Sequence, residues 1–236
     1  MGNDYFQFKQ FTVYQNRCAM KVGTDGVLLG AWSAFPPNGR ILDVGTGTGV
    51  IALMAAQRTQ SQIDGVEIDA DACRQAVENV ALSSWSDRIS LVEADFKRYA
   101  GECTCKYDYI VSNPPFFRNA LLSPAAARST ARHTVTLDYD TLFACAAGLL
   151  SPNGKIGLIF PAELESHVFA TALLHKFYLS RLTRLKGRPQ RPVKRILAEW
   201  SRTLTPYTEQ ELCIEQSLGV YSEEYKALLQ DFYLRW

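Results

Sequence analysis

A glycine-rich turn between an apolar run and a helical pattern constrains the fold of this chain more than any other feature. Gly45, Gly47 and Gly49 lie in the run Asp-Val-Gly-Thr-Gly-Thr-Gly, which follows the apolar segment Arg40–Val44 and precedes a helical pattern over 50–58. Glycine lets a ligand approach the backbone closely because it has no Cβ atom. A strand, this turn and a helix in that order are typical of the first unit of an α/β sheet that binds a nucleotide-like cofactor.

The chain continues with the same alternation of strand and helix. Strands are predicted over 62–67, 88–92, 107–112 and 155–160, and helices over 70–82, 139–150 and 164–175. Short apolar runs separated by helical patterns predict an α/β fold with a doubly wound, mostly parallel, Rossmann-like sheet.

The C-terminal part departs from this alternation. Strands are predicted over 177–186 and 195–200, and the loop between them is too short for a crossover helix. Because parallel neighbours need such a crossover, the two strands are expected to form an antiparallel C-terminal hairpin. Residues 211–216 are expected to add a short strand, and residues 222–233 a terminal helix.

We expect residues 1–236 to form a single domain, because the sequence contains no internal repeat, low-complexity tract or linker. Residues 1–38 are expected to be an N-terminal extension that packs on this domain. Aromatic residues near its start predict a small hairpin, and a helix is expected to begin at about Asp25. Residues 177–216 form the basic C-terminal hairpin region of the same domain.

Composition excludes several classes of protein. No stretch approaches the roughly 20 apolar residues of a membrane span, and the N-terminus lacks the pattern of a signal peptide. Six cysteines are scattered through the chain, and the one close pair, Cys103 and Cys105, has no partners at zinc-site spacing. We therefore expect a cytoplasmic protein with reduced thiols, no metal ion and no membrane contact. A monomer is assumed.

Positive charge is concentrated in the C-terminal hairpin region. Residues 176–202 contain nine lysines and arginines but only one acid, Glu199, which gives this segment a formal charge of +8 in a chain whose net charge is +1. A basic surface on an otherwise acidic protein is expected where a polyanion binds. Arg188, Arg191 and Lys194, in the loop of the hairpin, are candidate RNA contacts. A solvated charged hairpin is the alternative.

Two acidic positions favour S-adenosylmethionine (SAM) over NAD, which the glycine turn alone does not distinguish. Glu67 ends the second strand, where its carboxylate can accept hydrogen bonds from both ribose hydroxyls. Asp95 follows the third strand and can accept from an adenine amino group, while Phe96 can lie on the ring. SAM carries a sulfonium cation, so acids are acceptable where a pyrophosphate would be repelled. Asp43 is expected to brace the glycine turn and the amino-acid end of the cofactor.

The sequence Asn113-Pro-Pro-Phe116 ends the fourth strand beside the cofactor turn. The side-chain oxygen of Asn113 and the carbonyl oxygen of Pro114 can accept the two hydrogens of a planar amino group. They would offset the positive charge that develops on its nitrogen during methyl transfer. The prolines keep this turn rigid, and Phe116 offers a face for base stacking. An ordinary turn is the alternative, which the upstream glycine turn disfavours. The motif predicts methylation of an exocyclic or amide nitrogen.

A long segment without periodicity separates Phe116 from Leu137. Loops of this length inside a domain are usually functional or disordered. Its basic residues make it a candidate substrate lid and phosphate contact: Arg118, Arg128, Arg132 and His133.

Five segments in this order resemble a known family. They are Lys21–Trp32, Ile41–Gly49, Val66–Asp69, Ser112–Phe116 and Ala131–Thr134. Nearly the whole chain is similar to the bacterial methyltransferases that modify N6 of the adenine next to the anticodon of valine tRNA. This resemblance implies a class I SAM-dependent fold, whose seven-stranded sheet has an antiparallel last strand, and tRNA as the partner. It also implies that Lys21 and Thr24 lie near the methionine end of SAM. Phe116 stands where such enzymes often have tyrosine.

Two other functions are compatible with these residues. A glutamine-N5 methyltransferase could hold the amide of a protein substrate in the same clamp, although the basic hairpin suits phosphates better. A non-catalytic module that binds SAM and RNA is the third possibility, which the intact Asn113 and glycine turn disfavour.

Overall fold

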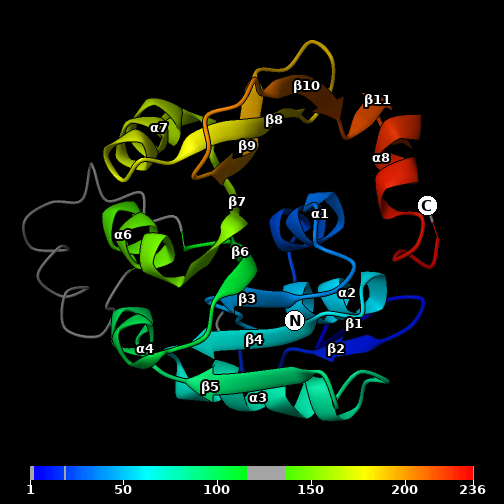
Figure 1. Cartoon of the computed structure of the whole chain (residues 1–236). Helices are drawn as coiled ribbons and strands as arrows, with labels where there is room; N and C mark the ends of the chain where they lie inside the picture. The colour runs from blue at the N-terminus through cyan, green and yellow to red at the C-terminus, as the bar shows by residue number, and fades with distance from the viewer. Residues whose placement is uncertain (1–2, 19, 116–136, 236) are drawn as a thin grey trace, which may run out of the picture.

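The computed structural model describes residues 3–18, 20–115 and 137–235. Within these ranges the central sheet has eight strands, in the order β10-β8-β9-β7-β6-β3-β4-β5 (Figure 1). These strands are β3 (Arg40–Val44), β4 (Gln62–Glu67), β5 (Ile89–Glu93), β6 (Tyr107–Ser112), β7 (Leu150–Pro161), β8 (Tyr178–Lys186), β9 (Val193–Ser201) and β10 (Thr208–Cys213). β9 runs antiparallel to its neighbours β7 and β8, and the other neighbouring pairs are parallel. The predicted mostly parallel α/β sheet and its antiparallel hairpin, β8–β9, are therefore confirmed.

Helices cover both faces of this sheet. They are α1 (Thr24–Trp32), α2 (Val50–Arg58), α3 (Ala70–Ala81), α4 (Phe96–Glu102), α6 (Tyr139–Leu149), α7 (Glu165–Leu174) and α8 (Glu223–Leu229), with a 3₁₀ turn, η1 (Ala162–Leu164), before α7. One apolar core lies between the sheet and α1, α2 and α8. A second core lies between the sheet and α4, α6 and α7, on the opposite side in Figure 1. Alternating βα connections produce this three-layered arrangement of helices, sheet and helices.

The N-terminal extension begins with the expected hairpin, formed by β1 (Tyr5–Gln7) and β2 (Thr12–Tyr14). Phe8 and Phe11 are buried beneath it, with ring centroids 4.5 Å apart. The side chain of Asn79, on α3, accepts from the backbone N–H of Tyr14 and donates to its carbonyl. The extension therefore packs on the sheet domain through aromatic contacts and a side-chain clamp.

The sheet has one strand more than the seven implied by the family resemblance, because β10 adds to the edge of β8. β10 is polar and its burial is slight, so it lacks the apolar pattern of a core strand. Cross-strand ion pairs link it to β8: Arg184 contacts Glu209 at 2.6 Å, and Lys186 contacts Glu211 at 2.8 Å. Opposite charges on neighbouring strands stabilise such a pair without burying much apolar surface.

Two further elements were not expected from the sequence. α4 begins directly after Asp95, although its seven residues end in Gly-Glu and show no helical periodicity. A second small hairpin, formed by β11 (Glu215–Ser217) and β12 (Val220–Tyr221), follows β10. Gly219 turns it with a φ of 76°, in the left-handed region that favours glycine. The terminal helix predicted over 222–233 is shorter, and ends at Leu229.

Candidate functional site

The glycine turn after β3 adopts a backbone conformation that requires glycine. Gly45 and Gly47 have φ angles of 72° and 56°, which place both in the left-handed region. The N–H of Gly45 donates to the carbonyl of Val66 at 2.8 Å, which fixes the turn against the end of β4. A Cβ atom at Gly45 would meet no atom within 4 Å, because this residue faces open space. The turn therefore leaves room for a ligand against its backbone.

Two adjoining cavities lie along this turn at the carboxyl ends of the parallel strands. The first has a volume of about 380 Å³ and the second about 250 Å³. Gly45, Gly47, Asn113 and Pro114 line both. A shared set of residues from the ends of β3 and β6 therefore separates the two spaces. Ligands of open α/β sheets bind at this edge.

The first cavity is enclosed by the glycine turn and the start of α1. Lys21, Thr24, Asp25 and Gly26 line it. The ammonium group of Lys21 donates to the carbonyl of Asn3 at 3.0 Å, which holds this side chain across the N-terminal extension. Lys21 and Thr24, which the resemblance placed near the methionine end of the cofactor, therefore lie on one wall of one cavity.

The second cavity is bounded by the ends of β4 and β5 and by the start of α6. Glu67, Asp95 and Phe96 line it, as do Ile68 and Thr141, which sequence reasoning missed. Asp95 accepts from the N–H of Arg98 at 3.0 Å and so caps α4. Most of the Phe96 side chain is buried in the core beneath the cavity, and it is 5% exposed. Ile68 could have been predicted as a cavity residue because it directly follows Glu67 at the end of a strand. No local sequence pattern indicates that Thr141 lines the cavity.

Glu67 is the acid that contacts the glycine turn. One of its carboxylate oxygens accepts from the N–H of Gly47 at 2.8 Å, and the other accepts from the N–H of Asp69 at 3.0 Å. The residue is only 9% exposed. Two backbone donors therefore hold the carboxylate in one orientation. Each carboxylate oxygen can accept a further hydrogen bond, and the residue lines the second cavity.

Asp43 braces the turn from below. Its carboxylate is fully buried and accepts from the hydroxyl of Thr46 at 2.7 Å. Burial raises the pKa of Asp43 to about 7, although the Thr46 hydrogen bond opposes the rise. The prediction that Asp43 braces the glycine turn agrees with this contact, and its part in binding the cofactor stays a prediction.

The raised pKa of Asp43 should make stability fall as pH increases. Between its unfolded value near 4 and its folded value of about 7, the folded chain retains a proton that the unfolded chain has lost. From pH 5 to pH 8 this linkage is expected to remove about 2–3 kcal/mol of unfolding free energy. In Asp43→Asn that loss should be absent, which urea unfolding of both proteins at the two pH values would measure. Equal pH dependence in the two proteins would contradict the assignment.

Asn113 stands between the two cavities at the end of β6. Its side-chain oxygen is buried and has no hydrogen-bond partner among the described residues. Next to it, the hydroxyl of Ser112 donates to the carbonyl of Val44 at 2.7 Å and ties the ends of β6 and β3 together. Buried polar atoms without a partner are uncommon and need an explanation, such as a ligand that binds there or a catalytic role. The Asn113 oxygen is therefore a candidate acceptor for a group bound in these cavities.

Several predicted site residues lie outside the described part of the chain. These are Phe116, Arg118, Arg128, Arg132 and His133. Pro114, in contrast, is described and lies beside Asn113 on the boundary of both cavities.

At least four of the nine cations in residues 176–202 are matched by acids from other parts of the chain. The pairs join Arg181 to Glu199, Arg184 to Glu165 and Glu209, Lys186 to Glu211, Arg188 to Glu215 and Arg195 to Asp25. Of these acids, only Glu199 lies within the segment 176–202. The charge of +8 counted along the sequence therefore overstates the local positive charge of the folded surface.

Arg188, Arg191 and Lys194 come together around one depression at the loop of this hairpin. With Ile214 they line a space of about 520 Å³. Arg191 and Lys194 are exposed, and Arg188 is 3.8 Å from its acidic neighbour, so its ion pair is long. Lys186 pairs with Val193 across the hairpin, and β8 is parallel to β7. The depression therefore lies on the same edge of the sheet as the two cavities.

Comparisons with known proteins agree with this geometry. The family model of the methyltransferase small domain matches residues 22–182. A tRNA1(Val) (adenine(37)-N6)-methyltransferase from Phocaeicola vulgatus is 47% identical over 99% of both chains, and one from Trichodesmium erythraeum is 45% identical over the full length of both. Among solved structures, a predicted O-methyltransferase from Agrobacterium tumefaciens has a TM-score of 0.71 at 18% identity, covering 88% of this chain and 96% of its own.

The sheet, the glycine turn and the paired cavities define a class I SAM-dependent methyltransferase, and SAM is its methyl donor. The chain belongs to the family of the tRNA1(Val) (adenine(37)-N6)-methyltransferases. Its residues fit SAM: Gly45 faces open space, and the Asn113 oxygen, which has no partner within the described part of the chain, leaves an acceptor at the same two cavities.

No helix in the described ranges is long and apolar enough to cross a membrane.

Proposed function

We propose that this enzyme transfers the methyl group of SAM to the exocyclic N6 of an adenine in tRNA, namely adenine 37 of tRNA1(Val). The side-chain oxygen of Asn113 carries this proposal, because it is buried at the junction of the two cavities and has no hydrogen-bond partner among residues 3–18, 20–115 and 137–235. The names of the full-length relatives support the choice of tRNA, and they disfavour the protein glutamine that the sequence alone left open.

We assign the cofactor to the two cavities by the chemistry of their walls. Glu67 would accept from the ribose hydroxyls, and Asp95 from the adenine amino group. Lys21 and Thr24 would bind the methionine carboxylate in the first cavity. Phe96 and Ile68 would offer apolar surface to the adenine ring.

Asn113 would act on the substrate rather than on the cofactor. The N6 lone pair of adenine is delocalised into the ring, which makes it a weak nucleophile. The Asn113 oxygen and the Pro114 carbonyl oxygen would accept the two N6 hydrogens and stabilise the positive charge that grows on nitrogen as the N–C bond forms. SAM supplies an electrophilic methyl group, whose carbon–sulfur bond breaks as that bond forms. The extra N6 proton then leaves to solvent. Alignment of nitrogen, carbon and sulfur supplies much of the rate.

The activity has a direct test. Purified protein is incubated with labelled SAM and unmodified tRNA1(Val), and the product is digested to nucleosides. N6-methyladenosine should appear, and it should be absent when adenine 37 is replaced by guanine. Label in the protein fraction, or none in any fraction, would contradict the proposal. Light scattering on the same sample would check the assumed monomer.

Replacing Arg188, Arg191 and Lys194 together with alanine should weaken tRNA binding and reduce its salt dependence. Each lost phosphate contact lowers the slope of log affinity against log salt by a little under one, so a decrease of about 2 is expected. The matched control replaces three cations outside the hairpin with alanine, namely Arg17, Arg74 and Lys226. Each of these cations forms an ion pair with an acid. Binding curves from 50 to 250 mM salt would measure both slopes. Identical slopes in the two variants would indicate that RNA does not bind at the hairpin.

A further inference from the structure

The position of α1 determines the shape of the first cavity. Thr24, Asp25 and Gly26, in the first turn of this helix, form one wall of the cavity, and the glycine turn after β3 forms another. A single helix moves largely as a rigid body, so a small rotation of α1 changes the width of this space. The contacts that hold the two ends of α1 are therefore relevant to cofactor binding.

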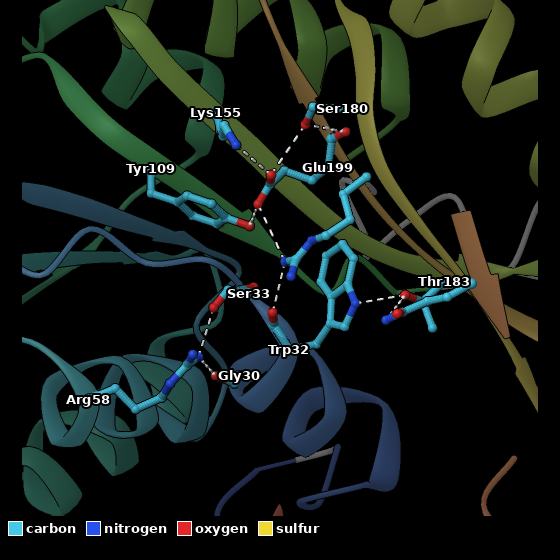
Figure 2. Close-up of polar contacts among 11 residues, drawn as sticks. Gly30, Trp32, Ser33, Arg58, Tyr109, Lys155, Ser180, Thr183 and Glu199 are labelled. Carbon is cyan, nitrogen blue, oxygen red and sulfur yellow. Dashed lines mark hydrogen bonds and ion pairs between the residues drawn. The ribbon is translucent and has the colours of Figure 1, made fainter. Parts of the chain in front are cut away.

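The C-terminal end of α1 is anchored on two sides. Arg58, on α2, donates to the carbonyls of Gly30 and Ser33, both at 2.8 Å, as Figure 2 shows. Arg181, on β8, donates to the carbonyl of Trp32 at 2.8 Å and lies 3.7 Å from the centre of its ring. Arginines at a helix C-terminus satisfy its last carbonyls and complement the helix dipole.

A buried carboxylate fixes Arg181 in turn. Glu199, only 1% exposed, is 3.5 Å from the Arg181 guanidinium and accepts from Tyr109 at 2.9 Å and from Lys155 at 2.9 Å (Figure 2). Burial, together with the Glu199 carboxylate, raises the pKa of Tyr109 well above its ordinary value, so this hydroxyl remains a donor. Trp32 also donates from its ring nitrogen to Thr183 at 2.9 Å. The C-terminal end of α1 is therefore held by a connected network.

The N-terminal end of α1 is held differently. Its N-cap residue is Gly23, which provides no side-chain cap. Arg195, near the start of β9, donates from Nε to the carboxylate of Asp25 at 2.7 Å. The side chains of Arg195 and Asp25 are 34% and 27% exposed, so solvent screens this pair only partly. Arg195 thus joins the basic hairpin to the cavity wall.

We propose that Arg195 is a positioning residue for the cofactor cavity. By holding Asp25, it keeps the first turn of α1 at the distance from the glycine turn that the methionine end of SAM requires. Along the sequence Arg195 is one of the nine cations of residues 176–202, but its contact with Asp25 assigns it to the cofactor side. This inference rests on the proposed assignment of the first cavity to SAM.

Arg195→Ala is expected to weaken SAM binding about five- to tenfold, within the usual range of coupling between sites. The KM for SAM should rise by a similar factor, while kcat at saturating SAM stays within about twofold and the KM for tRNA changes little. Arg195→Lys, which retains a cation, should recover much of the affinity. Arg184→Ala is the matched control, because Arg184 is a neighbouring hairpin arginine that pairs with Glu165 and Glu209 instead. Calorimetry and steady-state kinetics would supply these values.

A double-mutant cycle tests the route through Asp25. If Arg195 acts by holding Asp25, the variant Arg195→Ala/Asp25→Asn should bind SAM no more weakly than the weaker single variant. Additive losses would overturn the proposal, as would wild-type SAM affinity in Arg195→Ala or an effect confined to the KM for tRNA. If Arg195→Ala fails to fold, Arg195→Lys and Asp25→Asn carry the test. Failure of the wild-type protein to bind SAM would instead reject the cofactor assignment itself.

Discussion

Asn113→Ala is expected to lower turnover by about 10²–10³-fold while SAM affinity stays nearly unchanged. Its buried side-chain oxygen has no partner in the described ranges, and under the proposed function its loss removes one charge-stabilising partner from the transition state. Two measurements separate binding from chemistry: single-turnover methylation of tRNA with saturating enzyme, and calorimetric titration with SAM. The effect should therefore appear in the rate constant rather than in the affinity for the cofactor.

Asn113→Asp is the matched variant, because it has nearly the same shape and retains an acceptor oxygen. It should keep more activity than the alanine variant, with a rate that falls at low pH as the carboxylate gains a proton. A melting temperature within a few degrees of the wild type would show that both variants are folded. If the turnover of Asn113→Ala were within a factor of three of the wild-type value, Asn113 would not be part of the reactive site.

Glu67→Ala should weaken SAM binding by at least about 100-fold. Hydrogen bonds to a charged group contribute about 1.5–3 kcal/mol each, and two ribose hydroxyls would lose their acceptor. The same substitution also removes the acceptor for the N–H groups of Gly47 and Asp69, which loosens the glycine turn. Calorimetry with S-adenosylhomocysteine, which does not react, would measure the loss without turnover.

Glu93→Ala is the control for this experiment. Glu93 ends the neighbouring strand β5 directly opposite Glu67 in the sheet register, but its side chain is exposed and does not line either cavity. Its replacement removes the same charge from the same edge, so cofactor affinity should change less than threefold. Equal losses in the two variants would mean that general electrostatics, rather than the Glu67 contact, attracts the cofactor.

The middle of the sheet could be predicted from sequence because strands such as β3 and β6 are buried on both faces. Runs such as Tyr107–Ser112 are nearly continuous in apolar residues, and a parallel strand covered by helices on both sides needs that composition. The glycine turn was equally visible, since the positive φ angles of Gly45 and Gly47 restrict the residue type. Local patterns of this kind require no knowledge of distant contacts.

Other features depend on partners far away in the chain. β10 is stabilised by ion pairs with β8, and only its second half lies within the strand predicted over 211–216. α4 is short, and its clearest signal is the cap from Asp95, a residue first assigned to the cofactor alone. The surface charge of the hairpin was overestimated for the same reason, because the acids that pair with Arg184 and Arg195 lie outside the segment.

Within the candidate site, the residues at strand ends were predictable and those from later elements were not. Glu67 ends a recognisable strand, Asp95 and Asn113 follow one, and parallel strands end at one edge. Thr141 lines the second cavity because the start of α6 lies beside the ends of β4 and β5, which no local pattern reveals.

The contact of the hairpin with α1 limits how the enzyme could be redesigned. A chimaera that receives the β8–β9 hairpin of a relative, in order to change which tRNA it selects, would also replace Arg181 and Arg195. Because both side chains hold α1, such a graft should alter cofactor affinity unless these two arginines are retained. Exchanging only the loop 187–192 leaves both arginines in place.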